Sequence, residues 1–158
     1  MAEHLLTLAA TVRYYHDELG FNMRMGGLEG ASLTVKLKYL ESWNNRRREI
    51  AKRYLAEIKN DKVKMQQQSS GADSIFHLFV VTTKDKDSFV KHLQSNGINP
   101  GFHYPVPCHL QKAYSHLGYK QGDFPHSEYL ASHCVSLPMY AELSDEEVNH
   151  VIQIINKY

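Results

Sequence analysis

The spacing of apolar residues predicts a long helix in the first half of the chain. Between residues 27 and 60, large apolar side chains recur at intervals of three or four, close to one stripe of a helix. They are Leu33, Leu37, Leu40, Trp43, Ile50, Tyr54 and Ile58. With a rise of 1.5 Å per residue, this helix would be about 50 Å long, more than a small domain can cover. We therefore expect it either to bend or to pack on something beyond this domain.

After this helix, predicted strands and helices alternate. Residues 75–82 are rich in β-branched and aromatic side chains and predict a central strand. Asp85 is placed to cap a helix over Lys86–Ser95, and Gly97 to end it. Shorter segments predict strands at 98–103 and 135–137 and helical turns at 110–117 and 127–132.

The last helix has the clearest pattern. Ser144 and Glu147 have the spacing of a capping box, in which each side chain accepts a backbone N–H at the start of the helix. Apolar residues follow at i, i+3, i+4 and i+7, namely Val148, Val151, Ile152 and Ile155. Together the elements predict an α+β fold, a small and mostly antiparallel sheet with helices packed on one face, plus one long N-terminal helix.

Composition narrows the classes of function. The chain has 158 residues, 42% of them hydrophobic and 22% charged, as expected of one globular domain. A formal charge of +1 creates no overall field that would attract nucleic acid or an anionic membrane, so we expect neither partner. Cys108 and Cys134 form no CxxC pair, and no signal peptide or membrane-spanning segment is apparent. These features predict reduced thiols and a cytoplasmic protein.

Histidines and arginines are candidates for binding sites. The ten histidines include no HExxH or His-x3-His pair, so we expect no metal site. The run Arg46-Arg47-Arg48 could form a phosphate-binding face, but acidic residues such as Glu41 and Glu49 are interleaved with it. A solvated helix surface with ion pairs is therefore the interpretation that we favour.

Two segments stand out as candidate sites. Residues 20–33 (GFNMRMGGLEGASL) place glycines in a helical stretch, where each costs about 1 kcal/mol relative to alanine. This cost indicates a bend or a close approach by another backbone. Residues 101–114 (GFHYPVPCHLQKAY) combine aromatic residues, two histidines and stiff prolines. Such a loop either lines a ligand pocket or forms a packed cis-proline turn with no ligand.

Both segments resemble motifs of a known family. Residues 22–31, with the VKLK run at 35–38 and Arg46–Ala51, resemble the helix start of the DegT/DnrJ/StrS sugar aminotransferases. Residues 99–114 are similar to the HYP-P-H-Q-AY loop of that family, and further motifs follow in the same order up to the Ser-Leu-Pro-Met-Tyr run at 136–140. The resemblance covers about residues 12–158, and the most similar branch acts on 3- or 4-keto deoxysugar nucleotides.

The resemblance implies a domain assignment and a set of site residues. Residues 26–158 would be the C-terminal small domain of a fold-type-I enzyme that depends on pyridoxal phosphate (PLP), and residues 1–25 a remnant of the junction with the large domain. Asn22 would reach the PLP phosphate of the neighbouring subunit, with Arg24 supporting the same region. The residues implied near the nucleotide-sugar substrate are His103, Tyr104 and His109.

The implied reaction is transfer of an amino group to a keto-deoxysugar nucleotide. The Schiff-base lysine of the family lies ahead of the position of Asn22, whereas the first lysine here is Lys36. We therefore assign no catalytic residue, and expect the isolated chain to hold no cofactor and to be inactive alone. It would act as a homo-oligomer or with a separate PLP-binding large domain, as one half of a split enzyme. The alternative is a non-catalytic nucleotide-sugar-binding or assembly module.

Overall fold

The structure of the chain, a computed structural model, describes residues 10–12, 15–16 and 25–158. The chain forms two compact units, Met1–Glu41 and Ser42–Tyr158. The first unit contains the antiparallel strands β1 (Ala10–Val12) and β2 (Tyr15–His16) and helix α2 (Gly27–Leu37). The candidate cofactor ligands Asn22 and Arg24 lie outside the described residues, and the division into 1–25 and 26–158 stays a prediction.

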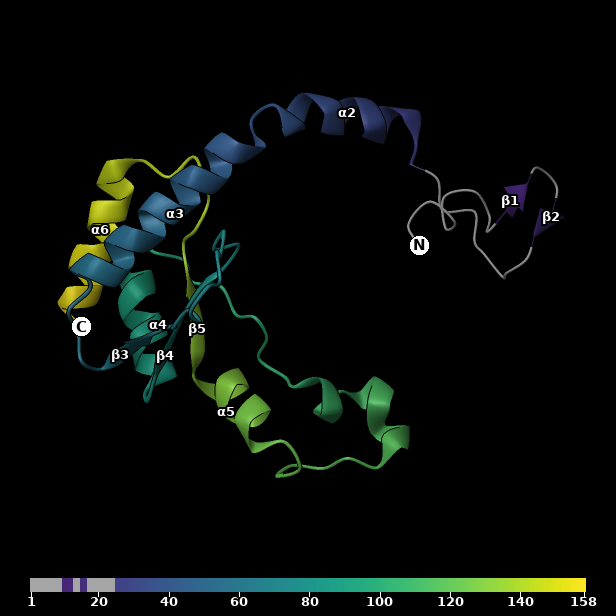
Figure 1. Cartoon of the computed structure of the whole chain (residues 1–158). Helices are drawn as coiled ribbons and strands as arrows, with labels where there is room; N and C mark the ends of the chain where they lie inside the picture. The colour runs from purple at the N-terminus through teal and green to yellow at the C-terminus, as the bar shows by residue number, and fades with distance from the viewer. Residues whose placement is uncertain (1–9, 13–14, 17–24) are drawn as a thin grey trace. The chain divides into compact units, whose positions relative to one another are not determined.

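The segment predicted as one helix over residues 27–60 is interrupted, and a bend was one of the two outcomes that its length led us to expect. Helix α2 ends at Leu37, and helix α3 (Leu40–Glu57) begins after a turn at Lys38 and Tyr39 (Figure 1). At this turn the backbone N–H groups of Lys38 and Tyr39 donate to carbonyl oxygens three residues back, at 3.3 and 3.0 Å. Hydrogen bonds of this type tighten and end an α-helix. The apolar spacing continues across the turn, so the length of the pattern indicated a bend but the spacing did not indicate its position.

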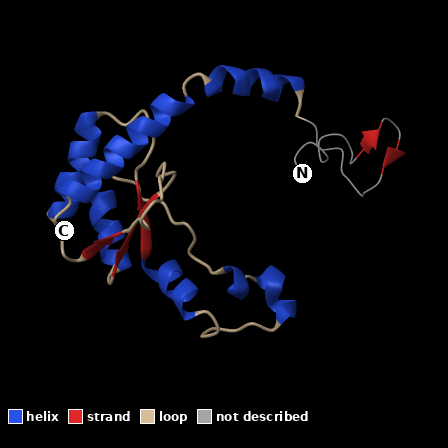
Figure 2. Ribbon diagram, viewed as in Figure 1, coloured by secondary structure: helices blue, strands red, loops and turns tan. Residues whose placement is uncertain are grey.

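The second unit is built on a three-stranded antiparallel sheet. The strands are β3 (Val63–Met65), β4 (Phe79–Thr83) and β5 (Cys134–Leu137), in the order β3-β4-β5 (Figure 2). The helices are α3, α4 (Lys86–Ser95), α5 (Pro125–His133) and α6 (Asp145–Asn156). Two short 3₁₀ helices, η1 (Cys108–Leu110) and η2 (Lys112–Leu117), lie between α4 and α5. This arrangement confirms the predicted α+β class.

The hydrophobic core joins one face of the sheet to α3, α4 and α6. Its largest fully buried side chains are Tyr54, Phe79, Phe89, Ile50, Leu93, Ile155, Val81, Val135 and Val148. Tyr54 meets Phe79 edge to face, with 5.1 Å between ring centres, and its hydroxyl donates to the carbonyl oxygen of Pro138 at 3.0 Å. Because side chains alternate along a strand, Ser136 points to the opposite face from Val135 and Leu137. The candidate loop meets the sheet on that opposite face.

The predicted helix caps are confirmed. The Asp85 carboxylate accepts the backbone N–H of Ser88 at 3.0 Å, and Gly97 has a φ of 77°, which suits glycine. The Ser144 hydroxyl accepts from the Glu147 N–H, and the Glu147 carboxylate accepts from the Ser144 N–H. The apolar stripe of α6 is buried as expected.

The strand predictions were partly wrong. Strand β4 begins at Phe79, because residues 75–78 form a loop in which Phe76 has a φ of 50° and a buried side chain. The aromatic composition of residues 75–78 therefore indicated a buried segment, but not a segment that pairs with another strand. Strand β3 was missed, since it has three residues and exposes Lys64. In place of a strand at 98–103, one bridge joins Gly101 to Ser136.

The arginine run of α3 binds groups of the protein itself. The Arg46 guanidinium donates to the Leu143 carbonyl oxygen and to Asp145, both at 2.8 Å. Arg47 donates to the carbonyl oxygen of Met139 at 2.9 Å. These contacts fasten the segment between β5 and α6 onto α3. The guanidinium groups of Arg46 and Arg47 therefore have a structural role, because they already bind carbonyl and carboxylate oxygens of the protein and not a phosphate.

Candidate functional site

The first part of the candidate site is the start of the loop that joins α4 to η1. Gly101 and Ser136 exchange two backbone hydrogen bonds of 2.9 Å, which attach the loop to β5. Two residues further on, Nδ1 of His103 lies 2.9 Å from the Ser136 hydroxyl. The ring of Tyr104 meets the imidazole edge to face at 5.4 Å, and Tyr104 is 74% exposed. His103 is thus anchored to the sheet, whereas Tyr104 is open to a ligand.

The second part of the candidate site surrounds His109. Its Nε2 lies 3.0 Å from a carboxylate oxygen of Glu128 on α5, and its side chain is only 8% exposed. The imidazole packs on the ring of Phe124 at 4.8 Å, and Tyr119 contacts the same ring at 5.2 Å. His109 therefore lies inside a small aromatic cluster and not on the loop surface.

Glu128 holds this cluster together, and sequence reasoning did not single it out as a site residue. Its carboxylate accepts the backbone N–H of Gly122 at 2.8 and 3.1 Å and that of Phe124 at 3.4 Å, besides contacting His109. The Gly122 N–H, with smaller contributions from His109 and Phe124, lowers the pKa of Glu128 below its ordinary value. The available signal was an acidic residue in the first turn of a predicted helix, which is too common to mark a site.

The structure brings His103 and Tyr104 together and separates them from His109. Across the described part of the chain, no hydrogen bond or ring contact joins His109 to either of the other two. The cis peptide bond of this loop joins His103 to Tyr104 and does not precede a proline, unlike the cis-proline turn considered as an alternative.

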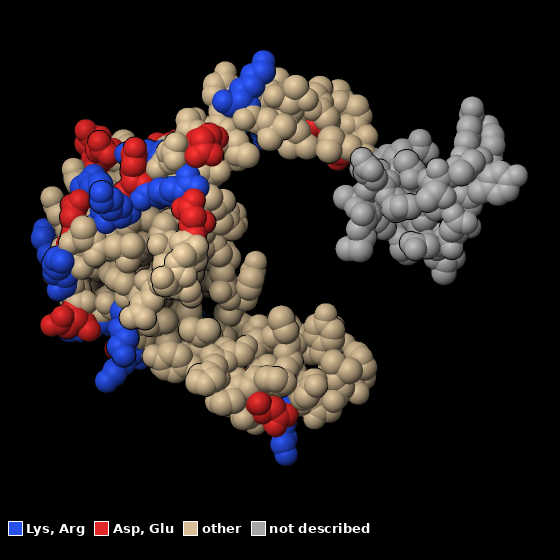
Figure 3. All heavy atoms as spheres, in the orientation of Figure 1, with Lys and Arg blue, Asp and Glu red and all other residues tan. Residues whose placement is uncertain are grey.

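The surface of the loop and α5 is mostly uncharged. Figure 3 shows Lys, Arg, Asp and Glu gathered over α3 and α6, whereas the part formed by η1, η2 and α5 displays few of them. Its exposed apolar side chains are Phe102, Tyr104, Val106, Leu110, Tyr114, Leu117, Tyr119, Phe124, Tyr129 and Leu130. Apolar area of this extent is typical of a surface that contacts a ligand or another protein.

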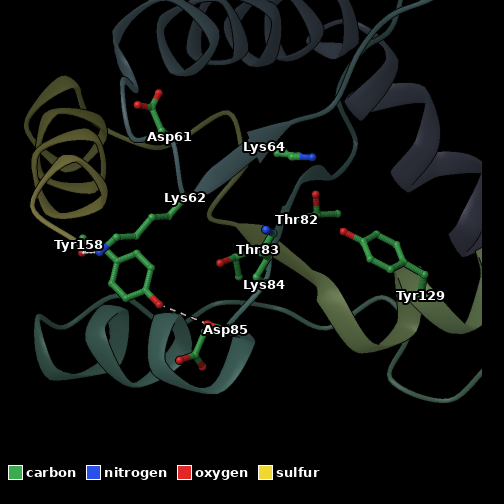
Figure 4. Close-up of a pocket in the computed structure, with 9 residues that line it drawn as sticks. All are labelled: Asp61, Lys62, Lys64, Thr82, Thr83, Lys84, Asp85, Tyr129 and Tyr158. Carbon is green, nitrogen blue, oxygen red and sulfur yellow. Dashed lines mark hydrogen bonds between the residues drawn. The ribbon is translucent and has the colours of Figure 1, made fainter.

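A separate cavity of about 290 Å³ lies near β3, β4 and the C-terminal residue (Figure 4). It is lined by Asp61, Lys62, Lys64, Thr82, Thr83, Lys84, Asp85, Tyr129 and Tyr158. The Lys62 ammonium donates to the backbone oxygen of Tyr158 at 2.8 Å, and the Tyr158 hydroxyl donates to the Asp85 backbone oxygen at 3.3 Å. His103, Tyr104 and His109 do not line this cavity, and its lysines share it with acidic side chains.

The described residues contain neither a candidate metal site nor a helix that could span a membrane. No group of three or more His, Cys, Asp or Glu side chains in them could hold a metal ion. Likewise, none of the helices in the described ranges is long and apolar enough to cross a membrane.

Comparison with known proteins identifies relatives over nearly the whole chain. The model of the DegT/DnrJ/EryC1/StrS aminotransferase family matches residues 2–156. The chain is 42% identical over 139 residues to a dTDP-3-amino-3,6-dideoxy-alpha-D-galactopyranose transaminase of Aneurinibacillus thermoaerophilus, covering 88% of this chain and 38% of the relative. It is 40% identical over 141 residues to the erythromycin biosynthesis sensory transduction protein EryC1 of Saccharopolyspora erythraea, covering 89% and 38%.

A solved structure agrees with these matches. The X-ray structure of S. venezuelae DesV in complex with a ketimine intermediate superimposes with a TM-score of 0.89 at 31% identity, covering 99% of this chain and 43% of DesV. The chain therefore spans about two fifths of the length of the curated relatives that it matches.

Proposed function

Because the chain belongs to the DegT/DnrJ/EryC1/StrS aminotransferase family, we propose that it supplies the C-terminal small domain of a PLP-dependent enzyme that transfers an amino group to a keto-deoxysugar nucleotide. The observation that carries this proposal is the 42% identity to a dTDP-amino-dideoxysugar transaminase over 88% of the chain. The His103–Tyr104 loop is what this domain would contribute to the substrate. The partner would be a second copy of the chain or a PLP-binding large domain.

His103 and Tyr104 are the proposed contacts to the nucleotide sugar. The Tyr104 side chain is exposed, and Nε2 of His103 makes no hydrogen bond within the described residues. Both groups can bond to sugar or phosphate oxygens. His109 stays in the proposed set, but Glu128 already binds its Nε2, so only its other ring atoms remain for a ligand.

Asn22 and Arg24 are the proposed contacts to the cofactor. An amide and a guanidinium are suitable donors to a phosphate group, and PLP would supply the electron sink that amino transfer requires. Both side chains lie outside the described residues, and substitution of each one tests its role.

A non-catalytic binding or assembly module is the second candidate. The uncharged surface formed by η1, η2 and α5 favours it, because such a surface can hold a partner without any chemistry. The two candidates differ in one measurable property. A module binds its ligand alone, whereas a small domain needs the rest of the active site.

The test is complementation with the separately expressed large domain of the Aneurinibacillus relative. We expect turnover of a keto-deoxysugar nucleotide by the mixture, and millimolar or weaker binding of the nucleotide by the chain alone, because polar contacts in open water contribute only about 1 kcal/mol each. His103→Ala should lower turnover, and Asn22→Ala should weaken PLP retention with little loss of folding stability.

The matched control is His126→Ala, which removes an exposed histidine of α5 that has no hydrogen bond in the described structure. It should leave turnover unchanged. Micromolar nucleotide-sugar binding by the chain alone would favour the module. A complemented enzyme indifferent to Asn22, His103 and His109 would make those residues structural.

A further inference from the structure

We propose that Ser136 and Gly101 are positioning residues, which hold His103 as the tautomer with its proton on Nε2 and offer that N–H to an oxygen atom of the ligand. This inference rests on the proposed function for the identity of the ligand, a nucleotide sugar. The arrangement of the three residues can be measured without any ligand.

The tautomer follows from the Ser136 hydroxyl. Ser136 is 4% exposed, and its only hydrogen-bond partner among the described side chains is Nδ1 of His103, at 2.9 Å. A buried hydroxyl that does not donate loses its hydrogen bond to water without replacement, which is strongly unfavourable. Since Nδ1 is the acceptor within reach, it must be the unprotonated nitrogen. In the neutral imidazole the proton then lies on Nε2.

Gly101 provides the space in which the imidazole lies. A Cβ atom at position 101 would lie 2.8 Å from Cε1 of His103 and 3.4 Å from its Nδ1. The first distance is shorter than real Cβ contacts, so any side chain there would push the ring away from the hydroxyl. Gly101 is also paired with Ser136 by two backbone hydrogen bonds of 2.9 Å. The hydroxyl, the ring and the loop start therefore form one rigid arrangement.

This arrangement determines what His103 can bind. Its Nε2 has no partner among the described residues and carries a proton, so it requires an acceptor. Sugar hydroxyl, carbonyl and phosphate oxygens are acceptors, and a protonated amine is not. The ring of the exposed Tyr104 contacts the same imidazole, and its hydroxyl is a second polar group on this loop. His103 is thus suited to the oxygen-rich part of a nucleotide sugar.

The test is nitrogen-15 NMR of the histidine rings in the full chain, which reports the tautomer of each neutral imidazole. We expect the Nδ1 of His103 to give a pyridine-type shift and its Nε2 a pyrrole-type shift. Ser136→Ala should move both toward the average of the two tautomers, and Gly101→Ala should do the same by displacing the ring. Ser136→Thr, which keeps a hydroxyl, should restore the original shifts.

Two variants serve as matched controls. Ser132→Ala removes a similar contact of 2.8 Å, between an exposed serine and Nδ1 of His133, and should leave the His103 signals unchanged. Gly27→Ala is the control for Gly101→Ala, because it adds a methyl group with nothing within 4 Å of it. It should also leave the His103 signals unchanged. Circular dichroism of every variant checks that the fold is kept.

In the complemented enzyme, Ser136→Ala should raise KM for the nucleotide sugar about five- to tenfold, as expected for the loss of one well-placed hydrogen bond, with a smaller effect on kcat. A proton on Nδ1, or His103 signals that do not respond to Ser136→Ala, would overturn the positioning proposal even if the enzyme is active. Signals that respond as expected, together with full turnover by His103→Ala, would support the positioning and reject the substrate role of His103.

Discussion

Glu128 illustrates how one side chain can organise a loop that has little regular structure. Its carboxylate accepts from the backbone at Gly122 and Phe124 and from the imidazole of His109. The residues between His109 and α5 are therefore tied to the first turn of that helix. Because an ionised carboxylate accepts these bonds more strongly than a neutral one, the state of the loop depends on pH.

We predict that Glu128→Gln reduces the loss of stability in acid. The pKa of Glu128 is lowered in the folded chain, mainly by the Gly122 N–H. Its contribution is therefore present above the unfolded pKa of about 4.3 and is lost as the pH falls through the lower folded value. Denaturant unfolding between about pH 6 and pH 3 should show a smaller decrease for Glu128→Gln than for the unmodified chain.

Two other carboxylates provide the comparison. The pKa values of Glu57 and Asp145 are also lowered, mainly by hydrogen bonds from Arg53 and Arg46. The variants Glu57→Gln and Asp145→Asn should show the same trend without changing the signals of His109. Identical acid profiles for Glu128→Gln and the unmodified chain would contradict the role assigned to Glu128.

At the scale of elements, the start of α6 is stabilised by reciprocal capping. Ser144→Ala removes the hydroxyl that accepts the Glu147 N–H at 3.2 Å, and should cost about 1 kcal/mol of unfolding free energy. Denaturant unfolding with an unchanged m-value measures this cost. Ser88→Ala, in the first turn of α4, is the matched control, because the Ser88 hydroxyl has no hydrogen bond in the described structure. Equal stability of both variants would contradict the prediction.

The contact of α3 with the segment after β5 depends on Tyr54. Tyr54→Phe leaves the Pro138 carbonyl oxygen without its 3.0 Å donor, and should cost about 1–2 kcal/mol. Burial raises the pKa of Tyr54 above its ordinary value, so its contribution is fully present below the unfolded pKa of about 10 and is lost as the pH rises further.

Urea unfolding between about pH 8 and pH 11 measures both effects of Tyr54→Phe. The variant should be less stable at pH 8 and should lose less stability above pH 10 than the unmodified chain. Tyr119→Phe is the control, because that tyrosine is exposed and its one contact within the described residues is a ring contact with Phe124. A parallel decline of the two curves would show that Tyr54 ionises equally in both states.

At the scale of the whole molecule, we predict that the chain associates in solution. Helix α2 has no buried residue, and its exposed side chains include Leu28, Leu33 and Leu37. Helices with exposed leucines tend to associate to remove apolar area from water. Light scattering after gel filtration should give at least the mass of a dimer, and Leu33→Glu with Leu37→Glu should reduce it to that of a monomer.

The control for this prediction is Leu55→Glu, which changes an exposed leucine of α3. It should leave the mass unchanged. If the unmodified chain is monomeric over a hundredfold range of concentration, the association proposed for α2 is wrong. If only the α3 variant dissociates, the interface lies on another element.

The sequence by itself determined the features that are local. The caps at Asp85 and Ser144 and the apolar stripe of α6 depend on residues three or four positions apart, so they could be predicted and were confirmed. The family was also identified from linked short motifs, and the comparisons agree with it. Each of these features is encoded within one stretch of the chain, so the spacing and the types of its residues are sufficient to predict it.

Only the tertiary structure decided how the candidate site is held. His103 is bound by a serine 33 positions away and His109 by a glutamate 19 positions away, and neither separation follows a local period. The position of the break at Lys38 and the late start of β4 could not be predicted for a similar reason. Apolar spacing indicates which residues are buried, but it does not indicate where backbone hydrogen bonding begins or ends. Contacts between distant segments, such as those of His103 and His109, depend on how the whole unit packs. No single segment of the sequence specifies them.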